Sequence, residues 1–90
     1  MAEISEEVLV VNRLGIHARP AAALVQKVLV FQSEVYISFE GNRVNAKSIM
    51  GLLTLAATRG SRLRITCTGD DAEDAMEAVK GLFASGFGED

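Results

Sequence analysis

Residues 15–22 read GIHARPAA, and this stretch marks the point where a loop gives way to a helix. Gly15 permits a tight turn, and Pro20 fits the first turn of a helix, where a backbone N–H is not needed. Apolar residues then recur at helical spacing as far as Phe31. His17 is therefore expected at the helix start, beside unpaired backbone N–H groups and the positive end of the helix dipole. Such a place can hold a phosphate, and an imidazole there can accept a phosphoryl group.

The rest of the chain divides into strand and helix patterns of different period. Alternating apolar and polar side chains predict strands, and apolar residues at helical spacing after capping or acidic residues predict helices. The predicted strands are 8–11, 34–40, 43–45 and 62–68; the predicted helices are 18–31, 49–58 and one from 72 that Gly86 ends; residues 87–90 are expected to be a frayed tail. Half-buried alternating strands favour a four-stranded antiparallel sheet with three helices on one face, an α+β fold of one domain over residues 1–90.

Composition limits the function classes. The chain has 90 residues, of which 49% are hydrophobic, and this suffices for one small core. A net charge of −3 disfavours nucleic acid as a partner. The single cysteine, Cys67, lies in a strand pattern and is expected to be a small buried hydrophobe. No signal peptide or membrane-spanning segment is recognisable, so a cytoplasmic protein without membrane insertion is expected.

The acidic residues at 70–74 raise the question of a metal site. Their spacing is not that of a calcium loop, and acidic residues at a helix start favour the helix dipole. Helix capping and a solvated face explain them better, so neither a metal nor a cofactor is expected.

Two segments carry a resemblance to a known family. GIHARPA at 15–21 and VNAKSIMGL at 44–52 closely resemble motifs of HPr, the histidine-containing phosphocarrier family of the bacterial phosphotransferase system. The resemblance spans essentially the whole chain and includes the element order. It implies a βαββαβα open-faced sandwich that carries a phosphoryl group on histidine. Enzyme I, phosphorylated by phosphoenolpyruvate, would donate the group and an enzyme IIA protein would accept it. The protein would be a monomer without turnover of its own.

The branch of the phosphotransferase system stays open. Residues 12–15 and 82–90 are more similar to the nitrogen-branch paralogue of HPr, whereas KSIMG at 47–51 is similar to sugar-branch proteins of bacteria that have an HPr kinase. The alternative function is therefore a regulatory binding module whose phosphorylation state controls partner proteins. An autonomous enzyme with His17 as general base is disfavoured, because no second acid–base residue is spaced near it.

The resemblance assigns roles by motif position. His17 matches the family's phosphorylated histidine, which transfers through Nδ1, and Arg19 matches the active-site arginine. The helix start and the arginine are expected to disfavour the protonated ring, which keeps it nucleophilic. After transfer, the backbone N–H groups of Ala18 and Arg19 are expected to bind the phosphate, and the guanidinium to pair with it. Arg19 as an ordinary solvated helix residue is the alternative.

The second motif supplies a regulatory residue. Ser48 matches the family's regulatory serine, which implies modification by an HPr kinase/phosphorylase. A serine at the start of a helix is also a good N-cap in any protein, and the two roles are compatible.

The helix that begins at 49 is expected to be a partner-docking surface, as the resemblance implies, because an exposed apolar patch normally means binding. Its apolar candidates are Ile49, Met50 and Leu53, of which Met50 and Leu53 are expected to be exposed. Lys47 adds charge at the rim of this surface or is simply solvated.

Overall fold

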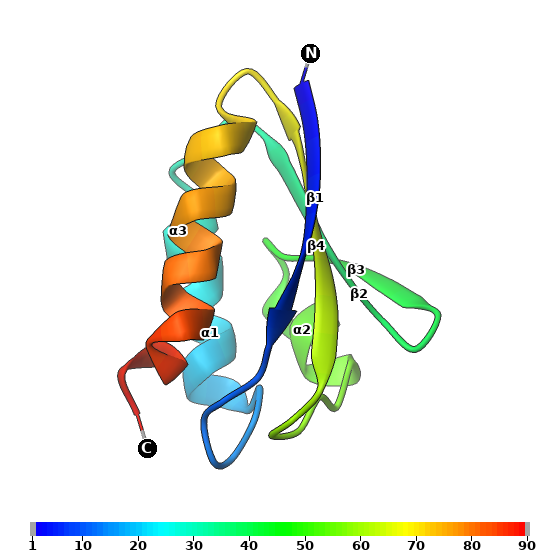
Figure 1. The fold of residues 1–90 in the computed structure, drawn as a ribbon, viewed down its shortest axis with the longest axis vertical. Helices are drawn as coiled ribbons and strands as arrows, with labels where there is room; N and C mark the ends of the chain where they lie inside the picture. Colours follow the sequence, from blue (N-terminus) through cyan, green and yellow to red (C-terminus); the bar gives the residue numbers. More distant parts are fainter. Residues whose placement is uncertain (1, 90) are drawn as a thin grey trace.

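The computed structural model describes residues 2–89, which form four strands, three α-helices and a short 3₁₀-helix (Figure 1). In chain order these are β1 (Ala2–Leu9), α1 (Ala18–Val28), β2 (Glu34–Phe39), β3 (Asn42–Asn45), α2 (Ile49–Thr54), β4 (Arg62–Gly69), α3 (Ala72–Ala84) and η1 (Gly86–Gly88). Neighbouring strands pair antiparallel in the order β1-β4-β2-β3. The predicted α+β open-faced sandwich is confirmed.

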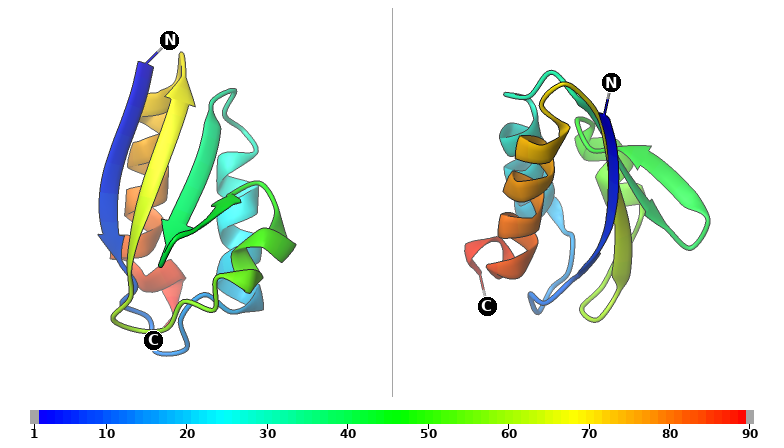
Figure 2. Two further views of the ribbon diagram at one scale, coloured as in Figure 1. Left: turned by 90° about the vertical axis from the view of Figure 1, so that its right-hand side faces the viewer. Right: turned by 45° about the horizontal axis from the view of Figure 1, so that its top comes forward.

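The core lies between the sheet and the helix layer. Every second side chain of β4 is buried, which follows from the alternation that predicted this strand. α1 and α3 lie side by side across one face of the sheet, and α2 sits at the edge of this layer, next to β3 (Figure 2). The largest fully buried side chains come from both layers and include Phe83, Leu24, Ile37, Leu52, Leu63 and Ile65.

Cys67 belongs to this core, as expected. It is 0% exposed, and burial raises the pKa of its thiol to about 11. The thiol therefore stays protonated at neutral pH and behaves as a small apolar side chain.

Several predicted boundaries are wrong for identifiable reasons. β1 already begins at Ala2, which pairs with Gly69, and its exposed Glu3 and Glu7 lie on the outward side of an edge strand. α1 ends at Val28 and α2 ends at Thr54, before the predicted ends. Ala56 adopts a left-handed φ of 52°, which a continuing helix cannot accommodate.

The predicted frayed tail is wrong for residues 87–89. Gly86, Phe87 and Gly88 have φ of 61°, 58° and 74°, and these left-handed conformations turn the chain back after α3. The ring of Phe87 meets that of Phe83 edge to face, with 4.9 Å between ring centroids. This contact fixes the tail against the core. Asp90 lies outside the described residues.

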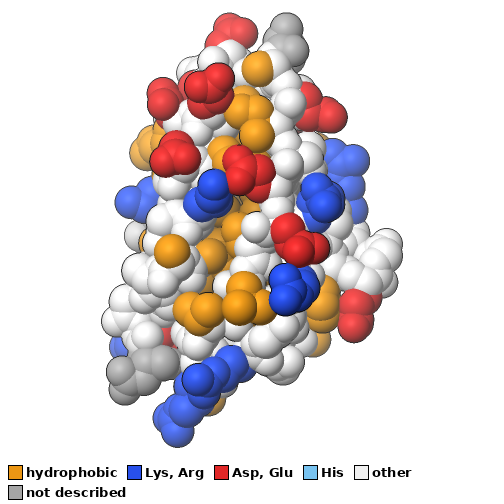
Figure 3. Space-filling model, in the orientation of Figure 1, with side chains coloured by type: hydrophobic (Ala, Val, Ile, Leu, Met, Phe, Trp, Pro, Cys, Tyr) orange, Lys and Arg blue, Asp and Glu red, His pale blue; other side chains and the backbone are white. Residues whose placement is uncertain are grey.

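Acidic side chains gather around the upper end of the molecule, where α3 begins, and hydrophobic side chains show between α3 and β1 (Figure 3). Asp71 occupies the N-cap position of α3, but the predicted cap bond is absent there. Its carboxylate instead accepts hydrogen bonds from the backbone N–H groups of Gln32 and Ser33, at 2.8 Å each, and from the Ser33 hydroxyl. Asp71 thereby ties the loop between α1 and β2 to the start of α3.

The Asp71 contacts predict a pH-dependent part of the stability. The hydrogen bond from the Ser33 hydroxyl, followed by that from the Gln32 N–H, holds the pKa of Asp71 below its ordinary value. A lowered pKa stabilises the fold above the ordinary value, and this stabilisation is lost as the pH falls. Asp71→Asn should lower the urea midpoint at neutral pH, and the gap to the wild type should shrink towards about pH 3.

Urea unfolding of Asp71→Asn and Asp70→Asn at both pH values checks this prediction. Asp70 is an exposed neighbour whose side chain has no hydrogen bond within residues 2–89, so its variant controls for the loss of one negative charge. Equal losses in both variants, or a gap that does not change with pH, would contradict the role of the Asp71 hydrogen bonds.

Candidate functional site

The loop that leads to His17 is shaped by a close backbone contact. Gly15 has φ of 70°, and a Cβ at this position would overlap the carbonyl of Ala57 and lie 2.9 Å from the Cα of Thr58. The next residue, Ile16, is buried and donates its N–H to the Ala57 carbonyl at 3.0 Å. Only glycine has both the conformation and the space that this approach requires. The contact places His17 directly before α1.

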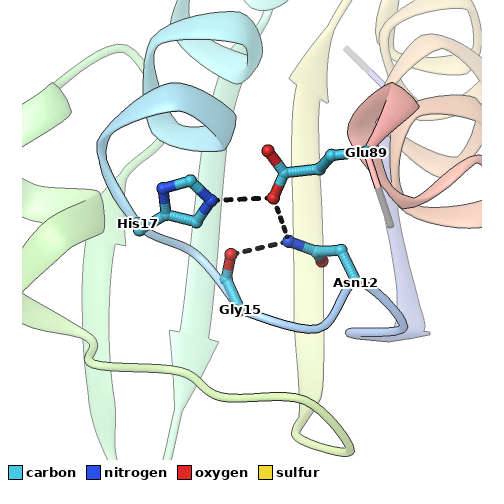
Figure 4. Close-up of polar contacts among 4 residues, drawn as sticks. All are labelled: Asn12, Gly15, His17 and Glu89. Carbon is cyan, nitrogen blue, oxygen red and sulfur yellow. Dashed lines mark hydrogen bonds and ion pairs between the residues drawn. The ribbon is translucent and has the colours of Figure 1, made fainter.

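His17 is the N-cap residue of α1, with extended backbone at φ −91° and ψ −168°. Its side chain is 36% exposed, and its Nε2 atom lies 2.7 Å from Oε1 of Glu89 (Figure 4). The same carboxylate oxygen accepts a hydrogen bond from Nδ2 of Asn12 at 2.9 Å. The Asn12 amide also donates to the Gly15 carbonyl at 2.7 Å. The hydrogen bond with Glu89 thus holds the ring at Nε2, while the His17 side chain as a whole remains half-exposed.

The Glu89 carboxylate that faces His17 is ionised at neutral pH. The hydrogen bond with His17 is the largest cause that lowers the pKa of Glu89, and the hydrogen bond from Asn12 is the second. The positive charge of Arg19 acts in the same direction. An acceptor-only group therefore faces Nε2.

The start of α1 offers free donors beside the ring. Within residues 2–89, no backbone carbonyl accepts from the N–H of Ala18 or Arg19, while Ala21 N–H donates to the His17 carbonyl at 3.0 Å. Pro20 lies in the first turn, as predicted, and its lack of an N–H costs nothing there. The first turn contains no acidic residue. A helix start with open N–H groups and no acidic residue in its own first turn is suited to an anion.

α1 and α2 run in opposite directions past one another. Ile16, before α1, bonds Ala57, which follows α2. Lys47, before α2, donates from Nζ to the carbonyl of Phe31, after α1, at 3.0 Å. The ammonium of Lys47 is thus engaged in a hydrogen bond to the backbone rather than simply solvated.

Ser48 is the N-cap of α2, as its position before an apolar helix predicts. Its Oγ accepts a hydrogen bond from the N–H of Gly51 at 3.1 Å. Because α1 and α2 are antiparallel, Ser48 lies at the opposite end of this pair from His17. The structure therefore does not bring the two residues into one site.

A family model described as "PTS HPr component phosphorylation site" matches residues 4–85. The chain belongs to the HPr family. It is 46% identical over 87 residues to the phosphocarrier protein HPr of Xylella fastidiosa (strain 9a5c), covering 97% of this chain and 98% of that protein. It is 45% identical over 76 residues to the HPr-like protein Crh of Halalkalibacterium halodurans, covering 84% of this chain and 90% of that protein.

The fold agrees with a solved structure of the same family. The crystal structure of HPr-C-His from Thermoanaerobacter tengcongensis is similar to this chain with a TM-score of 0.90 and 39% sequence identity, covering 100% of this chain and 99% of that one. The resemblance inferred from the two sequence motifs is confirmed, and with it the assignment to a family of phosphocarriers of the phosphotransferase system.

The HPr-like helix α2 exposes only part of its predicted docking residues. Met50 is 72% and Ile49 is 42% exposed. The expectation that Leu53 is exposed is wrong, because its side chain is half-buried and packs against the core beside the fully buried Leu52. A further exposed leucine, Leu14, is 63% exposed in the loop before His17.

Two residues of the His17 site have no counterpart in the motif analysis. Asn12 is 1% exposed and orients Glu89, which follows His17 by 72 residues in the sequence and reaches the ring from the segment after α3. The only sequence signal for this contact is the Gly-Phe-Gly segment at 86–88, whose turn-forming glycines mark a chain reversal.

Two negative findings concern residues 2–89 alone. Within this range, no group of three or more His, Cys, Asp or Glu side chains is placed to hold a metal ion. No helix in the same part of the chain is long and apolar enough to cross a membrane.

Proposed function

We propose that this HPr-family chain accepts a phosphoryl group on His17 from phosphorylated enzyme I and passes it to an enzyme IIA protein. The observation that carries the proposal is the half-exposed ring of His17 at the start of α1, beside two N–H groups that no backbone carbonyl occupies within residues 2–89. Membership of a phosphocarrier family supports the same assignment. In this proposal the protein is a cytoplasmic intermediate between enzyme I, which obtains the group from phosphoenolpyruvate, and enzyme IIA.

The site provides alignment and charge rather than a full catalytic apparatus. A ring nitrogen with a free lone pair attacks phosphorus, and the transferred group becomes a dianion beside the helix start. The N–H groups of Ala18 and Arg19 donate to its oxygens, and the guanidinium of Arg19 pairs with its charge. Local hydrogen bonding of about 1–3 kcal/mol suffices, because a carrier has to release the group to the next protein. The docked partner completes the charge neutralisation, so the chain has no turnover of its own.

Partner docking is assigned to the exposed side of α2 and the loop before His17. Met50, Ile49 and Leu14 are exposed apolar side chains on a small protein, which is typical of a surface that another protein covers. Leu53 packs against the core on the inner side of this surface. Lys47 fixes the start of α2 through its hydrogen bond to the Phe31 carbonyl rather than steering the partner.

The proposal predicts that His17 alone takes up the phosphoryl group. Incubation with phosphoenolpyruvate, magnesium and enzyme I should add one acid-labile phosphoryl group to the wild type. His17→Ala should take up none, since His17 is the only histidine in the chain. Mass spectrometry at neutral and acidic pH provides the measurement, and circular dichroism checks that the variant remains folded.

Addition of an enzyme IIA protein distinguishes a carrier from a regulatory module. Passage of the group to enzyme IIA supports the carrier. Retention of the group on His17, with altered binding to another protein, supports the regulatory alternative. A wild type that remains unlabelled beside active enzyme I would overturn both.

Arg19 is predicted to contribute to the transfer rate and not to the fold. It is exposed on α1, so Arg19→Ala should leave the unfolding midpoint nearly unchanged. Loss of one charge-assisted hydrogen bond should slow phosphorylation by about 10- to 100-fold. Rapid-quench kinetics with enzyme I measures the rate. Arg43→Ala, in the β2–β3 hairpin, removes the same charge far from His17 and serves as the control (Figure 1). An equal rate in both variants would remove Arg19 from the site.

Ser48 is proposed as a second, regulatory modification site. An HPr kinase with ATP should label the wild type but not Ser48→Ala. A phosphate at the α2 N-cap is compatible with the helix dipole, so the labelled protein should stay folded. Ser48 and His17 lie at opposite ends of the α1–α2 pair, so the phosphate on Ser48 should not contact the ring. It should slow transfer by adding negative charge to the docking surface. Peptide mapping that finds the label on another residue would contradict this assignment.

A further inference from the structure

We propose that Glu89 is a positioning residue that holds the ring proton of His17 on Nε2 and leaves Nδ1 as the nitrogen that takes the phosphoryl group. The inference rests on the phosphocarrier function proposed above and deepens it. The family reacts through Nδ1, and Glu89 is the means by which this chain would present that atom.

The geometry around Nε2 determines which nitrogen carries the hydrogen. Oε1 of Glu89 lies 2.7 Å from Nε2, and an ionised carboxylate can only accept a hydrogen bond. The neutral ring has one N–H, so the proton sits on Nε2 and the lone pair on Nδ1. Nδ1 points away from Glu89 (Figure 4), and no side chain within residues 2–89 makes a hydrogen bond to it.

Asn12 fixes the carboxylate in this position. Its Nδ2 donates both to Glu89, at 2.9 Å, and to the Gly15 carbonyl, at 2.7 Å. The reversed amide would place Oδ1 against two oxygen atoms, so the observed orientation is the one that satisfies the site. Oδ1 itself is buried without a hydrogen-bond partner in the described part of the chain. The side chain thus gives up one hydrogen bond in order to hold Glu89.

The tail that carries Glu89 lies outside the stretch that the family model matches. The family model matches residues 4–85, and the tail follows directly after that match. Phe87 anchors it against Phe83, and the N–H of Glu89 donates to the Gly86 carbonyl at 3.1 Å. Glu89 is therefore held by the fold of its own segment as well as by the ring and Asn12.

A proton fixed on Nε2 serves both directions of transfer. In the forward step the Nδ1 lone pair forms the N–P bond, while the bond from phosphorus to the donor breaks and its electron pair stays with the donor. The ring then carries a positive charge opposite the Glu89 carboxylate. In the onward step the electron pair of the N–P bond returns to Nδ1, and His17 leaves as neutral imidazole because Nε2 has kept its proton. Without that proton the leaving group would be an imidazolate, which is a much poorer one.

The ring itself provides the first test, in the unphosphorylated protein. Nitrogen-15 NMR of the wild-type ring should show one tautomer with a hydrogen-bonded Nε2–H that exchanges slowly with water. Glu89→Ala should lose the slow exchange and mix the tautomers. Glu89→Gln keeps an acceptor oxygen opposite Asn12 and should restore the Nε2–H signal. Glu73→Ala, which removes an exposed carboxylate from α3, is the matched control and should change nothing.

Transfer kinetics with enzyme I provide the second test. Glu89→Ala should slow phosphorylation of His17 by about tenfold or more, and Glu73→Ala should not. An unchanged ring spectrum in Glu89→Ala, or a changed spectrum with an unchanged rate, would overturn the role of Glu89 while leaving His17 as the acceptor. If the wild type takes up no phosphoryl group, the phosphocarrier function fails, whatever the ring spectrum shows.

Discussion

The position of the His17 ring depends on one close approach between two loops. The backbone at Gly15 lies against Ala57 and Thr58, and the Ile16 N–H is bonded to the Ala57 carbonyl. This contact fixes the start of α1 relative to the end of α2, so the ring and the open N–H groups lie beside the segment that follows α2. A side chain at position 15 would push these loops apart, because a Cβ has no space beside Ala57 and Thr58. The left-handed backbone of Gly15 also disfavours any other residue there.

The same packing separates the two residues for which modification is proposed, His17 and Ser48. The ring of His17 and the hydroxyl of Ser48 each lie at a helix start, which is a favourable location for a phosphate. Antiparallel packing of α1 and α2 places these starts far apart along the helix pair. The two residues proposed for modification are therefore not in direct contact with each other.

Sequence reasoning succeeded where the signal was local. The helix start at His17, the N-cap at Ser48 and the burial of Cys67 each follow from a few neighbouring residues, and each is observed. Glu89 was missed because its contact with His17 spans 72 residues and depends on three successive left-handed conformations after α3. The partial burial of Leu53 was missed for a related reason, since the face that a short helix turns to the core is set by its neighbours.

The buried thiol has a practical consequence for observing this protein at work. Cys67 is the only cysteine of the chain, and its full burial and raised pKa shield the thiol from thiol-directed reagents in the folded protein. A single cysteine introduced on the exposed side of α2, as in Met50→Cys, would be the sole point of attachment for a fluorophore. Docking could then be followed in real time on an otherwise native background.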